Sequence, residues 1–195
     1  MFGDFDWYKY LGKHKSAWEG HILYIYNQIQ EWKPKTVVEL GVYLGHSLAT
    51  MAEGCRDAGL NTKLYGVDHF KGDEHSGIFG REIEDIATEC LNTYPSVTLI
   101  KKTFNDALTD WEKRKDKKID LLHIDGRHFY EDIKEDFENW EVFVPKGGHI
   151  ILHDTQVTER NFGIKKYFAE LKESHPEWEF KERVESHGLG IITKL

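Results

Sequence analysis

The sequence of 195 residues has little of several features that mark other classes of protein. Its two cysteines, Cys55 and Cys90, lack the C-x-x-C spacing of a redox or zinc site. Both fall in helix-like segments, so we expect buried thiols in a reducing compartment. No run of about 18 apolar residues occurs, and the first residues lack the pattern of a signal peptide. We therefore expect a cytoplasmic protein without a membrane span.

Basic residues are also scarce. Lys and Arg number 26 against 34 Asp and Glu, which gives a net charge of −8. The one basic run, K-R-K-D-K-K at residues 113–118, suits a solvated helix end. Nucleic acid is therefore not an expected partner. Only four prolines, no low-complexity tract and no repeat are present, so nothing indicates a linker.

Short apolar segments alternate with longer amphipathic ones, a pattern typical of parallel α/β folds. The expected strands are residues 36–40, 63–67, 97–101, 119–124 and 149–152. Ser16 and Glu19 form a capping box for a first helix, and a second helix covers residues 47–58. Residues 178–185 and 189–194 predict a hairpin, which makes the last strand antiparallel. We expect an N-terminal helical or lid segment at 1–35 and one domain at 36–195.

The stretch V-V-E-L-G-V-Y-L-G-H-S at residues 37–47 predicts a strand, a glycine-rich turn and a helix. Such a unit presents backbone N–H groups and a helix N-terminus to a ligand. Dinucleotide sites have G-x-G-x-x-G, but Tyr43 stands where the second glycine would be. Glu39 would repel a diphosphate and suits an ammonium or sulfonium. The loop favours a cationic adenosyl ligand, with an ordinary strand-to-helix turn as the alternative.

Each of four acids, Glu39, Asp68, Asp125 and Asp154, lies at or near the carboxyl end of a predicted strand. In open α/β sheets the ligand crevice lies outside these ends, so the four carboxylates should converge on one edge. Such a cluster predicts a cationic ligand, a metal ion, or both.

Several longer motifs support a resemblance to a known family. They are G-D-E-H-S-G-I-F-G at 72–80, H-I-D-G-R-H-F-Y-E-D at 123–132, G-G-H-I-I-L-H-D-T at 147–155, F-G-I-K-K at 162–166 and G-L-G-I-I at 188–192. With these motifs the chain resembles the class I S-adenosylmethionine-dependent methyltransferases, in particular a small bacterial group found near or fused to glycosyltransferase and polysaccharide genes. The resemblance implies a Rossmann-like fold, with a seven-stranded, mostly parallel sheet, an antiparallel last strand and helices on both faces.

The same resemblance implies how S-adenosylmethionine binds. Gly41 and Gly45 let the turn approach the methionine end, and Glu39 faces the amino group directly or through water. Asp68 accepts both ribose hydroxyls. Asn105 and Asp106 lie where the family reads the adenine edge, although Asp106 is equally suited to cap the next helix. The remaining expected cofactor contacts are Tyr43, Ser47, His69 and Asp125.

Methyl transfer from a sulfonium needs an oriented and preferably deprotonated acceptor. His128, three residues after Asp125, is the candidate general base, with Asp125 and Asp154 as its catalytic partners. The alternative is a structural histidine bonded to a loop carbonyl.

Asp125 and Asp154 also suit a divalent cation that lowers the pKa of the acceptor. Catechol-type methyltransferases, which the fold resembles, hold magnesium with acids at these strand ends. Thr155 stands where their amide ligand lies, so His153 or His128 would complete a magnesium or manganese site. A histidine ligand favours manganese, iron or zinc over magnesium. Without a metal ion, Asp125 would contact only the cofactor and Asp154 would only orient His128.

Most of the 11 histidines are scattered. We expect surface or capping residues, and assign no other role, for His14, His21, His46, His149, His175 and His187. His69 and His75 differ, because they lie in the polar, glycine-bounded segment 69–80, which we expect to form a lid. Within it, Phe79 stands where the family usually has tyrosine, and it would stack on a sugar or anchor the lid. The aromatic segment 2–10 would cover the acceptor site, contact a second subunit of a homo-oligomer, or pack on the first helix.

We expect an O-methyltransferase that acts on a hydroxyl of a sugar or another small polyhydroxylated acceptor. Fold alone does not establish methyl transfer. One alternative is an S-adenosylmethionine-binding enzyme with another outcome, such as aminopropyl transfer or a hydroxylase-like reaction. The other is a non-catalytic module that binds S-adenosylmethionine or a partner enzyme.

Overall fold

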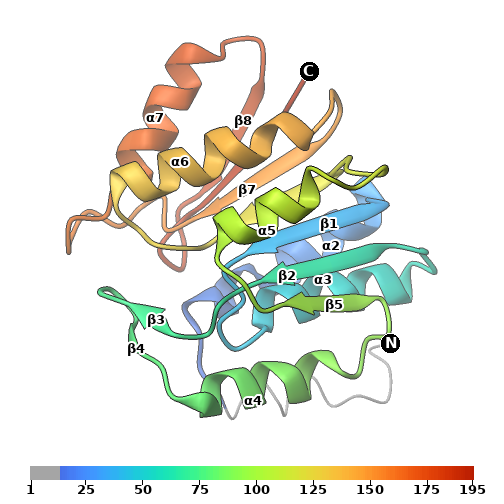
Figure 1. Cartoon of the computed structure of the whole chain (residues 1–195). Helices are drawn as coiled ribbons and strands as arrows, with labels where there is room; N and C mark the ends of the chain where they lie inside the picture. The colour runs from blue at the N-terminus through green and yellow to red at the C-terminus, as the bar shows by residue number, and fades with distance from the viewer. Residues whose placement is uncertain (1–13) are drawn as a thin grey trace.

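A seven-stranded sheet organises the chain in the computed structural model, which describes residues 14–195 (Figure 1). The strand order is β5-β2-β1-β6-β7-β9-β8. The first five of these are parallel, and β9 runs antiparallel to both of its neighbours. The expected sheet with an antiparallel last strand is confirmed. The strands are β1 Thr36–Leu40, β2 Lys63–Val67, β5 Val97–Ile100, β6 Leu121–Ile124, β7 His149–His153, β8 Glu179–Arg183 and β9 Leu189–Thr193.

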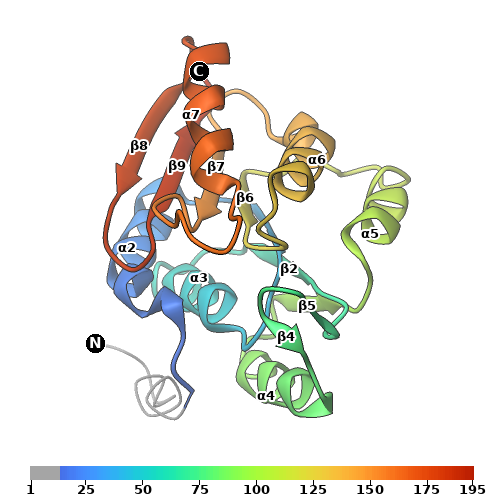
Figure 2. The same cartoon turned by 90° about the vertical axis from the view of Figure 1, so that its left-hand side faces the viewer.

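Helices cover both faces of the sheet (Figures 1 and 2). One face carries α2 (Ile22–Trp32), α3 (His46–Asp57) and α4 (Arg81–Leu91). The other carries α5 (Phe104–Trp111), α6 (Tyr130–Trp140) and α7 (Ile164–Ser174), with a short 3-10 turn, η2 (Glu141–Phe143), after α6. The central strands are buried on both sides, which explains why they read as continuous apolar runs rather than as alternating patterns.

The N-terminal helix begins at the predicted capping box. The Ser16 hydroxyl accepts a hydrogen bond from the Trp18 N–H, and Glu19 accepts one from the Ser16 N–H. The first turn, η1 (Ala17–His21), is a 3-10 helix that leads directly into α2. Trp18, Ile25 and Ile29 are buried in the core cluster that includes α3. The aromatic segment 2–10 lies outside the described residues.

Two histidines without an assigned role are core residues. His21 and His46, expected to be surface or capping residues, are almost fully buried. Both free cysteines are buried, as expected. The expectation for His21 and His46 was wrong because helical periodicity does not show which residues of η1 and α3 pack against other parts of the fold.

Two turns project over the carboxyl ends of the strands. The segment expected to be a lid contains a small antiparallel hairpin of β3 (Gly72–Asp73) and β4 (Gly77–Ile78) between β2 and α4 (Figure 1). The β8–β9 hairpin turns at Ser186, His187 and Gly188, all with positive φ. Both turns come from sequence positions far from the glycine loop that they approach.

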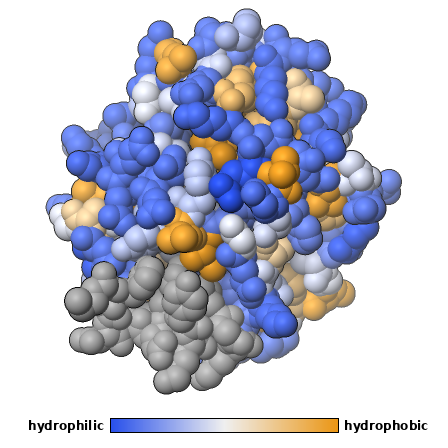
Figure 3. All heavy atoms as spheres, turned by 180° about the vertical axis from the view of Figure 1, so that it is seen from behind, coloured by the Kyte–Doolittle hydropathy of each residue, from blue (hydrophilic) through white to orange (hydrophobic). Residues whose placement is uncertain are grey.

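Apolar residues on the surface of the described chain are few and scattered. None of the helices in residues 14–195 is both long and apolar enough to serve as a membrane span. The face seen in Figure 3 is mostly hydrophilic, with separate hydrophobic spots. The exposed large hydrophobic residues of the described chain are Leu23, Tyr43, Ile78, Val142, Val184 and Leu195.

Trp140 tests the core between α6 and the sheet. Its side chain is fully buried, so we expect Trp140→Ala to lower the free energy of unfolding by about 3–5 kcal/mol. The nearby Val142→Ala is the control, because Val142 is 63% exposed and its loss should change stability by less than about 0.5 kcal/mol. Urea denaturation measures both, and equal effects would contradict the placement of α6.

Candidate active site

A cavity of about 680 Å³ lies outside the carboxyl ends of the strands. The chain leaves β1 for β2 on one side and reaches β6 on the other, so β1 marks the topological switch point where open α/β sheets bind ligands. Gly41, Asp68, Asp125 and Asp154 line the cavity from the loops after β1, β2, β6 and β7. Three of the four predicted acids therefore meet in one place.

The glycine loop packs directly against the end of β6. Gly41 has φ +94°, and a Cβ added there would lie 2.0 Å from the carbonyl oxygen of Asp125. Only glycine allows this approach. The N–H groups of Val42 and Tyr43 both donate to Asp68, at 2.9 and 3.0 Å. The loop is thereby tied to both β2 and β6.

Asp68 has a structural role that the sequence did not indicate. Besides the two loop N–H groups, its carboxylate accepts the Phe70 N–H at 2.7 Å. A carboxylate has about four acceptor sites, so about one remains for a ligand. The expected pair of bonds to two ribose hydroxyls is therefore corrected to capacity for one further donor.

Glu39 needs a larger correction, because it does not line the cavity. Its side chain is fully buried, and it accepts hydrogen bonds from Ser47 Oγ and, at 2.7 Å, from His123 Nδ1. Burial raises the pKa of Glu39, against the effect of these hydrogen bonds. Glu39 and Ser47 therefore form a polar contact beneath the loop, with the ring of Trp18 lying 5.4 Å from that of His123.

Gly45 and Asp106 also lie away from the cavity. Gly45 has φ +84° at the start of α3, and a Cβ there would meet Leu91 of α4 at 3.2 Å. The alternative expectation, that Asp106 caps the next helix, is also wrong: Thr103 is the N-cap of α5, and its hydroxyl accepts the Asp106 N–H and donates to the Asp106 carboxylate. The predicted cofactor residues that do line the cavity are Gly41, Tyr43, Asp68, His69, Asn105 and Asp125.

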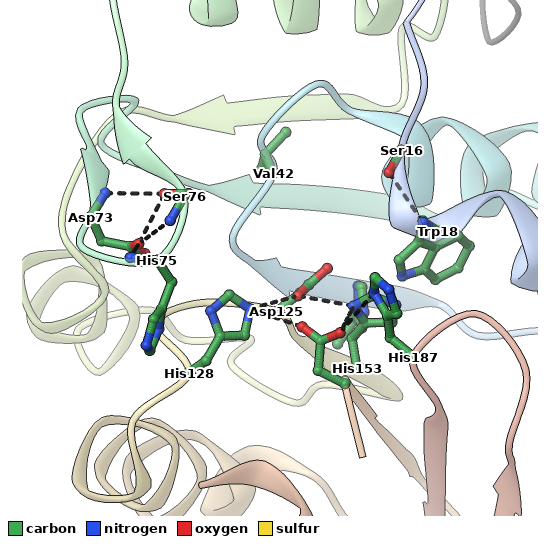
Figure 4. A network of polar contacts seen from close by, with 12 residues as sticks. Ser16, Trp18, Val42, Asp73, His75, Ser76, Asp125, His128, His153 and His187 are labelled. Atoms are coloured by element: carbon green, nitrogen blue, oxygen red, sulfur yellow. Dashed lines mark hydrogen bonds and ion pairs between the residues drawn. The ribbon is translucent and has the colours of Figure 1, made fainter. Parts of the chain in front are cut away.

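Asp125, His128 and Asp154 form the candidate metal or catalytic cluster, with potential ligand atoms within 4.8 Å of one another. His128 Nε2 lies 3.0 Å from Asp154 Oδ2 and 3.8 Å from Asp125 Oδ1. Figure 4 shows His128 on one side of Asp125, with His153 and His187 on the other. His128 thus faces the carboxylates, and its buried Nδ1 has no hydrogen-bond partner among the described residues.

His153 lies behind this cluster rather than in it. Its Nδ1 is 3.3 Å from Asp125 Oδ1 and 3.5 Å from Asp154 Oδ1, and its side chain is almost fully buried. Of the two histidines expected as a third metal ligand, His128 belongs to the cluster and His153 does not. Thr155 is fully buried and belongs to the core.

The two carboxylates hold protons on the neighbouring histidines. Burial lowers the pKa of His128, but hydrogen bonds to Asp125 and Asp154 outweigh it and raise the pKa to about 9. Burial likewise opposes the ionic attraction of Asp125 that raises the pKa of His153 to about 10. In turn, despite burial, the histidines hold the pKa of Asp125 well below its usual range. Without a bound cation, His128 is therefore protonated at neutral pH.

The backbone at Asp154 and in the β8–β9 turn is strained around the cluster. Asp154 has φ 61°, an uncommon value for a non-glycine residue and one found often at functional sites. Two contacts fix the turn: the Gln156 N–H donates to the His187 carbonyl at 2.8 Å, and His21 Nε2 donates to the Ser186 carbonyl at 3.0 Å. This brings His187 Nδ1 within 3.5 Å of Asp154. Sequence reasoning missed His187, whose only signal was the short S-H-G turn.

The lid and the loop before α7 meet across the cavity. His75 Nε2 donates to the Arg160 carbonyl at 2.8 Å, and the Arg160 guanidinium donates to the His75 carbonyl. The His75 ring lies 4.2 Å from Phe129 and 4.6 Å from Phe162. Phe79 contacts Tyr43 at 5.1 Å between ring centroids, which supports an anchoring role for it. These contacts support the interpretation of segment 69–80 as a lid.

Comparison with known proteins identifies the family. A family model described as a methyltransferase domain matches residues 38–155, which include the glycine loop and all four acids. The chain belongs to this methyltransferase family.

Solved structures of similar fold agree with that assignment. The methyltransferase superposes on an O-methyltransferase from Bacillus cereus in complex with SAH with a TM-score of 0.72, at 15% identity over 98% of this chain and 92% of that one. It also resembles the O-methyltransferase TomG from Streptomyces achromogenes, involved in tomaymycin synthesis and in complex with SAM, with a TM-score of 0.69 at 13% identity over 95% and 89% of the two chains.

A relative in sequence is the uncharacterized protein y4gI of Sinorhizobium fredii, 38% identical over 178 residues. The match covers 91% of this methyltransferase and 19% of the relative, so the chain spans about a fifth of that protein's length.

The role of Glu39 can be tested by stability. Glu39→Ala should lower the free energy of unfolding by about 3 kcal/mol or more, because it leaves His123 and Ser47 buried without their partner. Glu39→Gln should lose less stability, because its side-chain carbonyl oxygen can still accept hydrogen bonds from Ser47 and His123. The exposed Glu31→Ala is the control, with an expected change below about 0.5 kcal/mol in urea denaturation. If Glu39→Ala matches the control, the carboxylate is not a structural partner.

Proposed function

We propose that this methyltransferase transfers a methyl group from S-adenosylmethionine to a hydroxyl of a small polyhydroxylated acceptor, with carbohydrates as the leading class. The observation that carries the proposal is the cluster of Asp125, His128 and Asp154 in the same cavity as the glycine loop. The glycine loop supports an adenosyl ligand, and the cluster supports activation of a hydroxyl. The proposal includes the association with polysaccharide genes that the sequence resemblance implies.

The cavity offers suitable groups for each part of S-adenosylmethionine, which supplies an electrophilic methyl group on a sulfonium. Gly41 and the partly exposed Asp125 carboxylate suit the methionine end with its ammonium group. Asp68 retains one acceptor site for a ribose hydroxyl, and Tyr43 lines the same wall. Phe104 and Asn105, at the start of α5, suit the adenine.

His128 can take the acceptor proton only when its Nε2 carries none. With a pKa of about 9 beside two carboxylates, it is protonated at neutral pH. A divalent cation on Asp125 and Asp154 would weaken the attraction that holds this proton, and it would lower the pKa of an acceptor hydroxyl. The three side chains fit a manganese or magnesium ion, because two hard oxygens and one imidazole are available. The same Nε2 cannot act as base and ligand at once.

The acceptor end of the cavity is polar, which supports a hydroxyl-rich substrate. Beyond Asp154 its walls carry hydrogen-bonding groups from three loops, among them Ser16, Glu159, Arg160 and His187. Phe162, which is stacked on His128 with the ring centroids 4.3 Å apart, adds an aromatic ring of the kind that packs on sugar rings. Membership in the family favours methyl transfer over aminopropyl transfer, a hydroxylase-like outcome or a non-catalytic module.

Ligand binding tests the cofactor. S-adenosylhomocysteine should bind the wild-type protein in calorimetry, and Gly41→Ala should weaken it at least tenfold because the new Cβ separates the loop from Asp125. Gly147→Ala is the matched control: Gly147 also has positive φ, but an added Cβ there meets nothing within 4 Å. Absence of binding by the wild-type protein at micromolar concentration would refute the proposal.

Manganese binding tests the cluster. We expect Asp125→Asn and Asp154→Asn each to weaken Mn²⁺ binding at least tenfold in electron paramagnetic resonance titrations, while the surface variant Asp110→Asn does not. His128→Ala separates the two roles of the imidazole. Weaker Mn²⁺ binding would make His128 a ligand, whereas unchanged binding with lost turnover would make it the base. Turnover that survives EDTA treatment would remove the metal from the proposal.

A further inference from the structure

Asp136 carries a buried carboxyl group to which the proposed function assigns no role. On α6 it shares the inward face with Ile133, Phe137 and Trp140, a spacing at which an apolar residue is expected. Its side chain is 9% exposed and lines the cavity. Within residues 14–195, no hydrogen bond or ion pair involves its carboxyl oxygens. A buried polar group without a partner is costly, so its retention calls for an explanation.

The surroundings of Asp136 form one end of the cavity, away from the His128 cluster. Gly126 lies between Asp136 and Phe104: a Cβ added there would come within 2.4 Å of the Phe104 ring and 3.4 Å of Asp136 Oδ2. The bare backbone of Gly126 therefore lets the Phe104 ring and the Asp136 carboxyl both lie close to it in the cavity wall. Asn105 also lines this end, but its side-chain nitrogen already donates to Glu135 at 3.1 Å. Asp136 is thus the unengaged polar group at this end.

The charges around Asp136 favour its neutral form. Burial raises its pKa to about 7, with a further contribution from Asp132 and Glu135 on the same helix, and Arg127 after β6 opposes them. From α5, the facing residues Phe104 and Asn105 carry no charge. At neutral pH a large fraction of Asp136 therefore carries a proton.

A neutral carboxyl presents one O–H donor beside one carbonyl acceptor. Adenine presents the complementary pair on its edge, a ring nitrogen that accepts and an exocyclic amino group that donates. An ionised carboxylate offers acceptors only and would leave the ring nitrogen unpaired. The planar purine also suits the space beside the Phe104 ring.

We infer that Asp136, as a protonated carboxyl, recognises the adenine edge of S-adenosylmethionine, and that binding is therefore linked to proton uptake. This inference rests on the proposed function, because it requires an adenosyl ligand in the cavity. It adds a specificity-determining residue on α6 to the loop residues considered so far.

Calorimetry with S-adenosylhomocysteine between pH 6 and pH 8 tests the inference. Titrations in two buffers of different ionisation enthalpy give the number of protons taken up. We expect uptake to approach one proton per site as the pH rises above 7, and the affinity to fall by up to about tenfold per pH unit there. Below pH 7 the affinity should be nearly constant, because the free protein already carries the proton.

Three variants separate this role from a structural one. Asp136→Asn keeps a donor and an acceptor but does not titrate, so it should bind as tightly as the wild type at pH 8 or more tightly, without proton uptake. Asp136→Leu keeps the branched skeleton, with a larger volume, and removes both hydrogen-bonding groups, so it should bind at least tenfold more weakly. Glu138→Gln, on the same helix but outside the cavity, should behave as the wild type.

The possible failures are distinguishable. Wild-type protein that binds S-adenosylhomocysteine without proton uptake, or Asp136→Leu that binds within twofold of it, would overturn the role of Asp136 and leave the proposed function intact. Loss of proton uptake in Glu138→Gln would also overturn it, since another group would be titrating. Wild-type protein that binds no S-adenosylhomocysteine at any pH would overturn both.

Discussion

The close approach of Gly41 to the carbonyl of Asp125 is the contact on which the rest of the site depends. It brings the ends of β1 and β6 together at the switch point, where the order of the strands along the sheet reverses. Because the loop lies so close, its next two N–H groups reach Asp68, and the Asp125 side chain is directed into the cavity. A side chain at position 41 would push the glycine loop away from the end of β6.

Charge compensation is the second constraint. Asp125 and Asp154 lie side by side in a partly buried site, where two unpaired carboxylates would repel each other. His128 and His153 supply the opposite charge from two directions, and the strained backbone of Asp154 shows that the fold holds this arrangement. A cation in the proposed site would compete with the histidine protons for the same carboxylates. This competition connects metal binding to the readiness of His128 to accept a proton.

The two parts of the cavity shift the pKa of a carboxyl group in opposite directions. Around Asp125 and Asp154, positive partners keep the acids ionised. Around Asp136, burial and acidic neighbours favour the neutral form. One cavity can thus hold a charged, polarising centre at the reacting end and a neutral hydrogen-bonding group at the other, because local environment rather than residue type sets the ionisation state.

The sequence by itself determined the sheet and the location of the site. The apolar runs at 36–40 and 63–67 match β1 and β2, and the acids that follow the strands marked the correct edge. The tertiary structure alone decided which of these side chains reach the cavity. Glu39 is buried with Ser47 and His123, and of the two candidate histidines His128, not His153, belongs to the cluster. His187 reaches the cavity from the distant β8–β9 turn. Asp136 reaches it from the buried face of α6, whose other residues are apolar. The pattern of apolar residues predicts where each strand ends at the edge of the sheet. The direction of each side chain depends on contacts between segments that are far apart in the sequence.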